Sequence, residues 1–119
     1  MNPEVKAKFG SLPGLEKAYF LAVLIHALTV TVRDIGYTRG LSAEITQQKL
    51  MNINEIMHTA SGKLGAALSK SKFEYPDDVF IDILFESAQP HCVSELEYAL
   101  DFAFERTKLP GIESELTNR

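Results

Sequence analysis

The pair Glu55 and His58, three positions apart in the segment NINEIMHTASG (residues 52–62), is the strongest candidate for chemistry in this 119-residue sequence. If the segment is helical, the two side chains lie on neighbouring turns of one side of the helix. Bundle enzymes of the ferritin-like kind present metal ligands with this Glu-x-x-His spacing. A metal site is therefore the first hypothesis to weigh.

A di-iron site of that kind needs a second Glu-x-x-His pair and two further carboxylates. Neither His26 nor His91 has a glutamate three positions before it, so the second pair is missing. A mononuclear zinc or iron site of His26, His58 and a carboxylate such as Glu55 is the alternative. We favour a structural His–Glu contact that fixes the register between helices, and we expect no cofactor.

Other signs of catalysis are weaker. Cys92 directly follows His91, but consecutive residues of a helix point in different directions, so the pair does not indicate a nucleophile with its base. The glycine-containing segments lack the strand and the lysine of a phosphate-binding loop. Nothing in the sequence calls for an enzyme.

The elements that would position these residues are helices. Turn residues, capping signals and apolar periodicity predict helices over residues 15–35, 42–71, 77–88 and 92–108, the last with a Ser94-x-x-Glu97 capping box. The segment VFIDILF (79–85) is the one place where a strand is an alternative. We predict an all-α fold, a four-helix up-down bundle of two antiparallel hairpins, in a single domain 1–119 with flexible ends at 1–13 and 110–119.

The helix over 15–35 carries apolar residues on every side, which predicts a central position in the bundle. Its uncharged stretch, Ala18–Val32, is shorter than the roughly 20 residues that a membrane span needs. With one cysteine and no apparent secretory leader, we expect a cytoplasmic protein that does not enter a membrane.

Two rows of residues follow the spacing of a helix-packing seam. On the second helix the row is Met51, Glu55, His58, Gly62, Gly65 and Ser69, and on the first it is Tyr19, Ala22, His26, Thr29 and Arg33. Small residues in the first row would allow another backbone to come close. The rows could face each other within one chain, meet rows of a second chain, or face solvent. We expect a symmetric homodimer built on these two helices.

Charge is distributed unevenly along the chain. Residues 1–72 hold nine Lys or Arg and five Asp or Glu, whereas residues 73–105 hold nine Asp or Glu and no Lys or Arg. Glu97, Asp101 and Glu105, spaced four apart, form an acidic ridge on the fourth helix. The acidic half could lie against the chain's own basic half, or it could bind a basic protein. It disfavours nucleic acid.

Two functions follow from these patterns. The first is a small soluble helical interaction or regulatory module that acts through protein–protein contacts. The alternative is a metal- or small-ligand-binding bundle centred on His26, Glu55 and His58. A helical bundle as such favours neither, because bundles host many unrelated functions.

Overall fold

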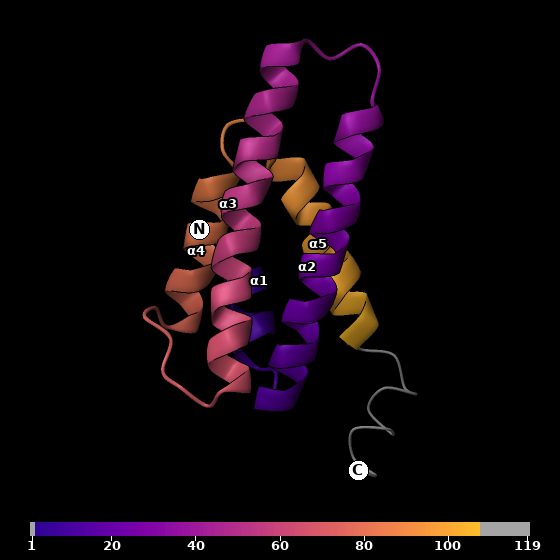
Figure 1. Ribbon diagram of the computed structural model, residues 1–119. Helices are drawn as coiled ribbons and strands as arrows, with labels where there is room; N and C mark the ends of the chain where they lie inside the picture. Colours follow the sequence, from indigo (N-terminus) through magenta and orange to yellow (C-terminus); the bar gives the residue numbers. More distant parts are fainter. Residues whose placement is uncertain (1, 108–119) are drawn as a thin grey trace.

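The computed structural model describes residues 2–107. Helices joined by short loops make up this part of the chain, and no strand occurs in it. Figure 1 shows the five helices in chain order: α1 (Pro3–Gly10), α2 (Gly14–Tyr37), α3 (Ala43–Leu68), α4 (Asp77–Ala88) and α5 (Val93–Thr107). The all-α class is thus confirmed. The flexible end that the sequence predicts over residues 110–119 lies outside the described part of the chain.

The first helix of the structure is an addition to the four that the sequence indicates. Residues 3–10, which the sequence analysis assigned to a flexible end, form α1, with Pro3 in its first turn and Phe9 fully buried. The buried ring of Phe9, together with an ion pair from Lys6 to Asp82, anchors this short helix against α4. Eight residues with one buried side chain show too little periodicity to be recognised in a sequence.

The four longer helices begin and end close to the predicted positions. Ser42 is the N-cap of α3, and its side chain accepts a hydrogen bond from the backbone N–H of Ile45. α4 begins at Asp77 after Pro76, and its helical form settles the choice between helix and strand for residues 79–85. The predicted capping box of α5 is wrong, because the helix begins at Val93 and Ser94 therefore lies inside its first turn.

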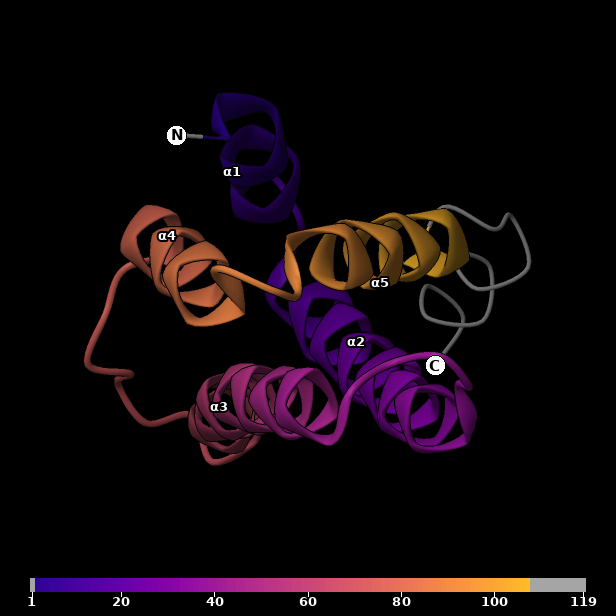
Figure 2. The ribbon, with the colours of Figure 1, turned by 90° about the horizontal axis from the view of Figure 1, so that it is seen from above.

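The helices pack around α2, which contacts both α3 and α5. Seen from above in Figure 2, α2 lies between these two helices, while α4 lies beside α3 and α1 beside α4. Successive long helices run in opposite directions, and the tip of the α2–α3 hairpin extends beyond the other helices (Figure 1). The molecule is elongated, with extents of 48 × 30 × 26 Å.

Only one side of α2 is buried, although its sequence is apolar all round. Phe20, Leu21, Leu24, Leu28 and Ile35 face the core, and the opposite side is open. Two neighbouring helices and short α1 do not cover its whole circumference. α2 is also the one helix among the described residues that is long and apolar enough to cross a membrane by length and composition alone.

The core is centred on aromatic side chains. The ring of Phe9 lies 5.4 Å from that of Phe20 and 5.6 Å from that of Phe80, and Phe20 lies 4.4 Å from Phe104. These four rings come from four different helices. Burial of four such rings accounts for much of the apolar stabilisation that holds α1, α2, α4 and α5 together.

Candidate interaction surface

The predicted row on α3 lies on the outside of the molecule. All six members, Met51, Glu55, His58, Gly62, Gly65 and Ser69, are exposed. A Cβ atom added to Gly65 would have no atom within 4 Å, and one added to Gly62 would meet only the ring of Phe73, at 3.4 Å. No helix of residues 2–107 therefore packs on this row.

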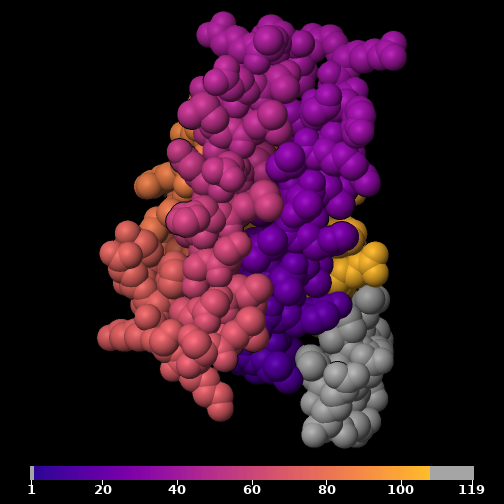
Figure 3. Space-filling view, in the orientation of Figure 1, coloured from indigo at the N-terminus to yellow at the C-terminus, as the bar shows by residue number. Residues whose placement is uncertain are grey.

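The predicted row on α2 is exposed as well. Ala22, His26, Thr29 and Arg33 are open to solvent, and Tyr19 is half-buried. α2 and α3 lie side by side at the front of Figures 1 and 3, and the row of each helix lies on its solvent-exposed side. They do not face each other within the chain, so that alternative is excluded.

We call this surface the hairpin face. It consists of Leu15, Ala22, His26, Thr29 and Arg33 of α2 with Met51, Glu55, His58, Gly62, Gly65, Leu68 and Ser69 of α3, all of them exposed. Leu15, Met51 and Leu68 have 61%, 53% and 69% of their surface open to solvent. Arg33 and Glu55 are the only formally charged members. Most monomer surfaces carry a denser mixture of charges.

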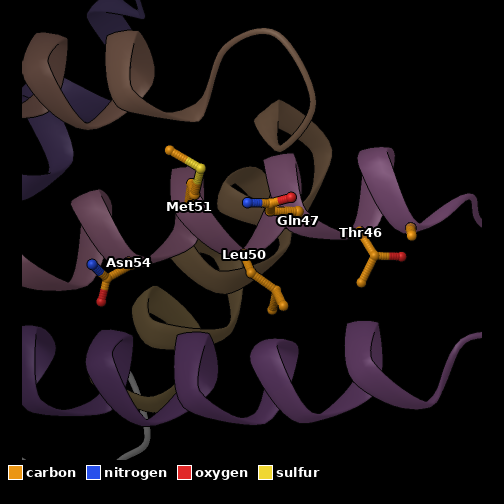
Figure 4. Close-up of a pocket in the computed structure, with 6 residues that line it drawn as sticks. Thr46, Gln47, Leu50, Met51 and Asn54 are labelled. Carbon is orange, nitrogen blue, oxygen red and sulfur yellow. The ribbon is translucent and has the colours of Figure 1, made fainter.

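A shallow hollow of about 520 Å³ lies near one end of this face. It is lined by α3 residues that include Gln47, Leu50, Met51 and Asn54. In Figure 4 Leu50 points from α3 toward α2, and Met51 points away from α2. The hollow is lined mainly by apolar atoms, so it offers a place for an apolar side chain of another molecule.

The residues of the metal alternative are not gathered into a site. His26 lines a small groove against Tyr98 and Phe102 of α5, while Glu55 and His58 lie on the outer side of α3. Within residues 2–107 no group of three or more His, Cys, Asp or Glu side chains could hold a metal ion. Nor does any hydrogen bond or ion pair of the described residues join His26 to Glu55.

The acidic half of the chain is partly neutralised by the basic half. Four lysines from residues 1–72 pair with carboxylates from residues 73–105: Lys6–Asp82 at 2.9 Å, Lys17–Asp77 at 2.8 Å, Lys63–Asp77 at 3.0 Å and Lys49–Glu95 at 2.6 Å. These pairs hold α4 and α5 against the N-terminal helices. These three carboxylates therefore lie against the chain's own basic half, which is the first of the two explanations for the uneven charge.

The acidic ridge is not neutralised in this way. Glu97, Asp101 and Glu105 are exposed, and none makes an ion pair with another residue in the described range 2–107. Glu97 and Asp101 line a groove between α1 and α5, of about 420 Å³, which Lys8 and Phe104 also line. The ridge is thus open to an external cation.

Asp77 is the centre of the strongest charge network. Burial by itself raises the pKa of Asp77, but hydrogen bonds and charges from Lys17 and Lys63 outweigh burial and hold that pKa below its ordinary value of 3.8. Lys63 also lies over the rings of Phe73 and Phe80, 5.0 and 5.1 Å from their centroids. The sequence does not reveal the buried position of Lys63, because only the fold brings the aromatic rings around it.

The single cysteine has no catalytic environment. The thiol of Cys92 is buried and donates a weak hydrogen bond to the backbone carbonyl of Lys49, 3.4 Å away. Burial, together with the charge of Glu95 and against that of Lys49, raises its pKa to about 11. The thiol is therefore protonated at neutral pH and inert as a nucleophile.

Comparison with known proteins adds no assignment. No family model matches the chain, and neither the curated proteins nor the solved structures yielded a match. The hairpin face and the acidic ridge therefore have to be interpreted from their own geometry and chemistry.

Proposed function

We propose that this chain is a small soluble protein-interaction module of the cytoplasm, and that its principal binding surface is the hairpin face. In this proposal α2–α5 form an up-down four-helix frame and α1 closes one end of it. The frame presents the α2–α3 hairpin to a protein partner, and neither nucleic acid nor a membrane is required.

The observation that carries the proposal is a pair of neighbouring long helices whose exposed rows include large apolar side chains and only two charged residues. Large apolar side chains such as Leu15 and Leu68 lose unfavourable contact with water when a partner covers them. Gly62 and Gly65 permit a partner helix to approach the α3 backbone closely. Glycine at these positions costs helix stability, and the monomer gains no packing from it.

A photo-crosslinking amino acid at Met51 tests the proposal in the cells that make the protein. The matched control carries the same amino acid at Glu86, an exposed position on α4 away from the hairpin face. We expect a discrete protein adduct from position 51 that position 86 does not give. Equal adduct patterns from the two positions would count against the hairpin face as a binding surface.

The acidic ridge is a second candidate binding surface, and we propose that it binds a basic protein segment. Three carboxylates without an ion pair among residues 2–107 form this ridge, and Lys8 of the same chain, 5.7 Å from the centroid of the Phe104 ring, shows that the groove beside the ridge suits a lysine side chain. Asp101→Lys should weaken binding of a fluorescent lysine-rich peptide, and added salt should weaken binding to the wild type. Glu86→Lys makes the same charge change away from the ridge and should have little effect. Equal loss in both variants would show that only net charge matters.

A further inference from the structure

We propose that the partner of the hairpin face is a second copy of this chain, related by a two-fold axis that runs parallel to the helices. This inference rests on the proposed role of the hairpin face. In this arrangement α2 of one protomer lies across α3 of the other, and the two hairpin tips point the same way. The four helices of the two hairpins then enclose a shared core.

The size of the hairpin face fits such a dimer. The 24 residues of α2 span about 36 Å. Two helices packed at 8–10 Å make a face about 20 Å wide. Each protomer would therefore bury about 700 Å², close to the roughly 800 Å² per partner of a standard stable interface.

The levels of residues along the hairpin place small residues opposite small residues. Residues 14–21 of α2 and residues 63–71 line one groove, and the two helices run antiparallel, so Ala22 lies within about one helical turn of the level of Gly62. A two-fold axis parallel to the helices keeps these levels across the interface. Ala22 then lies near Gly62 of the partner subunit. Close packing of the partner's helix at this point would explain the absence of side chains at the glycines, which packing within the monomer does not require.

The two charges of the face are complementary in the same arrangement. Arg33 lies at about the level of Met51, so Glu55 of the partner subunit is about one helical turn away, about 6 Å along the axis, within reach of an arginine side chain. By symmetry this ion pair forms twice. Among residues 2–107 the one ion pair of Arg33 is with its neighbour Asp34, at 3.9 Å, and both side chains are more than half exposed. The most exposed leucines, Leu15 and the partner's Leu68, cover each other at the opposite end.

A lipid surface is the competing occupant, since α2 alone has the length and composition of a membrane span. The α3 half of the hairpin face disfavours lipid. It presents Glu55, His58 and Ser69 beside the apolar side chains. Such polar groups are tolerated in a helix–helix interface, where they find partners, and are costly against hydrocarbon chains.

Sedimentation equilibrium of the full chain tests the dimer. At about 100 µM we expect twice the chain mass, because an interface of this size gives micromolar or tighter association. Arg33→Glu and Glu55→Arg should each weaken association at least tenfold, and the double variant should restore it. The control Arg39→Glu makes the same charge change at the exposed hairpin tip, outside the face. A single-chain mass at this concentration, or a double variant no better than the single ones, would overturn the proposal.

A disulfide experiment tests the orientation. Because Cys92 is buried, a protein with Ala22→Cys and a protein with Gly62→Cys each carry one accessible thiol. The mixture should form a crosslinked dimer under mild oxidation, and neither protein alone should do so. Crosslinking of either protein with itself would contradict the parallel axis.

Flotation of the wild type with neutral phospholipid vesicles, without self-association, would favour lipid instead. A monomer that still gives a foreign adduct at Met51 would refute this inference and leave the interaction role standing.

Discussion

Nζ of Lys63 lies 3.0 Å from Oδ1 of Asp77, and this pair links the end of α3 to the start of α4 across the loop between them. The lysine side chain is only 11% exposed, because its methylene chain and ammonium group lie among the aromatic rings of the core. Asp77 also binds Lys17, so one carboxylate connects α2, α3 and α4. The network fixes the lower end of the hairpin, and with it the geometry of the hairpin face.

Lys63→Ala should destabilise the protein substantially. The substitution removes an ion pair, cation–π contacts and the packing of the methylene chain, which together are worth about 2 kcal/mol of unfolding free energy. Lys63→Met keeps the packing and should cost less. Urea denaturation measures both, with the exposed Lys72→Ala as the control, expected within about 0.5 kcal/mol of wild type. Equal stability of Lys63→Ala and the control would refute the role of the network.

Stability should fall in acid as Asp77 becomes protonated. The pKa of Asp77 is lowered in the folded protein, so the folded state binds fewer protons than the unfolded chain around pH 3–4. The contribution of this group is therefore present above the ordinary value of 3.8 and is lost as the pH falls through the folded pKa. Asp77→Asn should cost about 1 kcal/mol at pH 7, and the cost should shrink toward pH 2.

The control for this pH dependence is Asp78→Asn. Asp78 is exposed, and its carboxylate accepts a hydrogen bond only from the neighbouring Val79 N–H in the described chain. Its effect on the unfolding free energy should be small at both pH values. Thermal unfolding across the pH range measures the difference. A constant difference between wild type and Asp77→Asn from pH 7 to pH 2 would contradict the assignment.

Asn52 should be the least replaceable polar residue of α3. Asn52 is buried, with 6% of its surface exposed. Its amide nitrogen donates hydrogen bonds to the backbone carbonyls of Ser87 and Gln89, at 2.9 and 3.0 Å. Asn52→Leu leaves both carbonyls without a donor, which should cost about 2–3 kcal/mol of unfolding free energy. Asn54→Leu, an equal change at an exposed position, should be close to neutral. A similar stability of the two variants in urea would argue against this tie between α3 and the α4–α5 connection.

Cys92 should resist thiol reagents until the protein unfolds. With its pKa raised to about 11, the thiolate fraction at pH 8 is about a hundredfold lower than for a thiol at the ordinary 9.0, and burial blocks access as well. Absorbance on reaction with an aromatic disulfide measures the rate. The control is Ser94→Cys in a Cys92→Ser background, whose exposed thiol should react rapidly. Fast reaction of native Cys92 would contradict its buried position.

Sequence patterns were sufficient for the four longer helices and insufficient for α1 and for the surroundings of each helix. The Ser42 cap, Pro13 before α2 and Pro76 before α4 are local signals, and the structure begins helices next to each. Phe9 in α1 is buried only because α2 and α4 supply partners from elsewhere in the chain. The apolar circumference of α2 likewise cannot reveal which side its neighbours leave open. The spacing of the α3 row predicted a seam, and the structure places that row at the surface, where its role as an interface stays a prediction.

Gly65→Ala distinguishes the needs of the monomer from those of the proposed dimer. Gly65 lies inside α3, and an added Cβ meets no atom within 4 Å, so the substitution should raise the unfolding free energy of the monomer by about 0.5–1 kcal/mol. Denaturation in an Arg33→Glu background, in which the proposed dimer is weakened, measures this gain. Gly40→Ala is the control in the opposite direction, because its φ of +91° strains any other residue and should lower stability. In the dimer the added methyl group separates α3 from the partner's α2, so the same Gly65→Ala variant should dissociate more readily in sedimentation. A variant that is less stable as a monomer would show that Gly65 serves the chain's own fold, and a stabilised variant with undiminished association would show that close approach at this position is not needed.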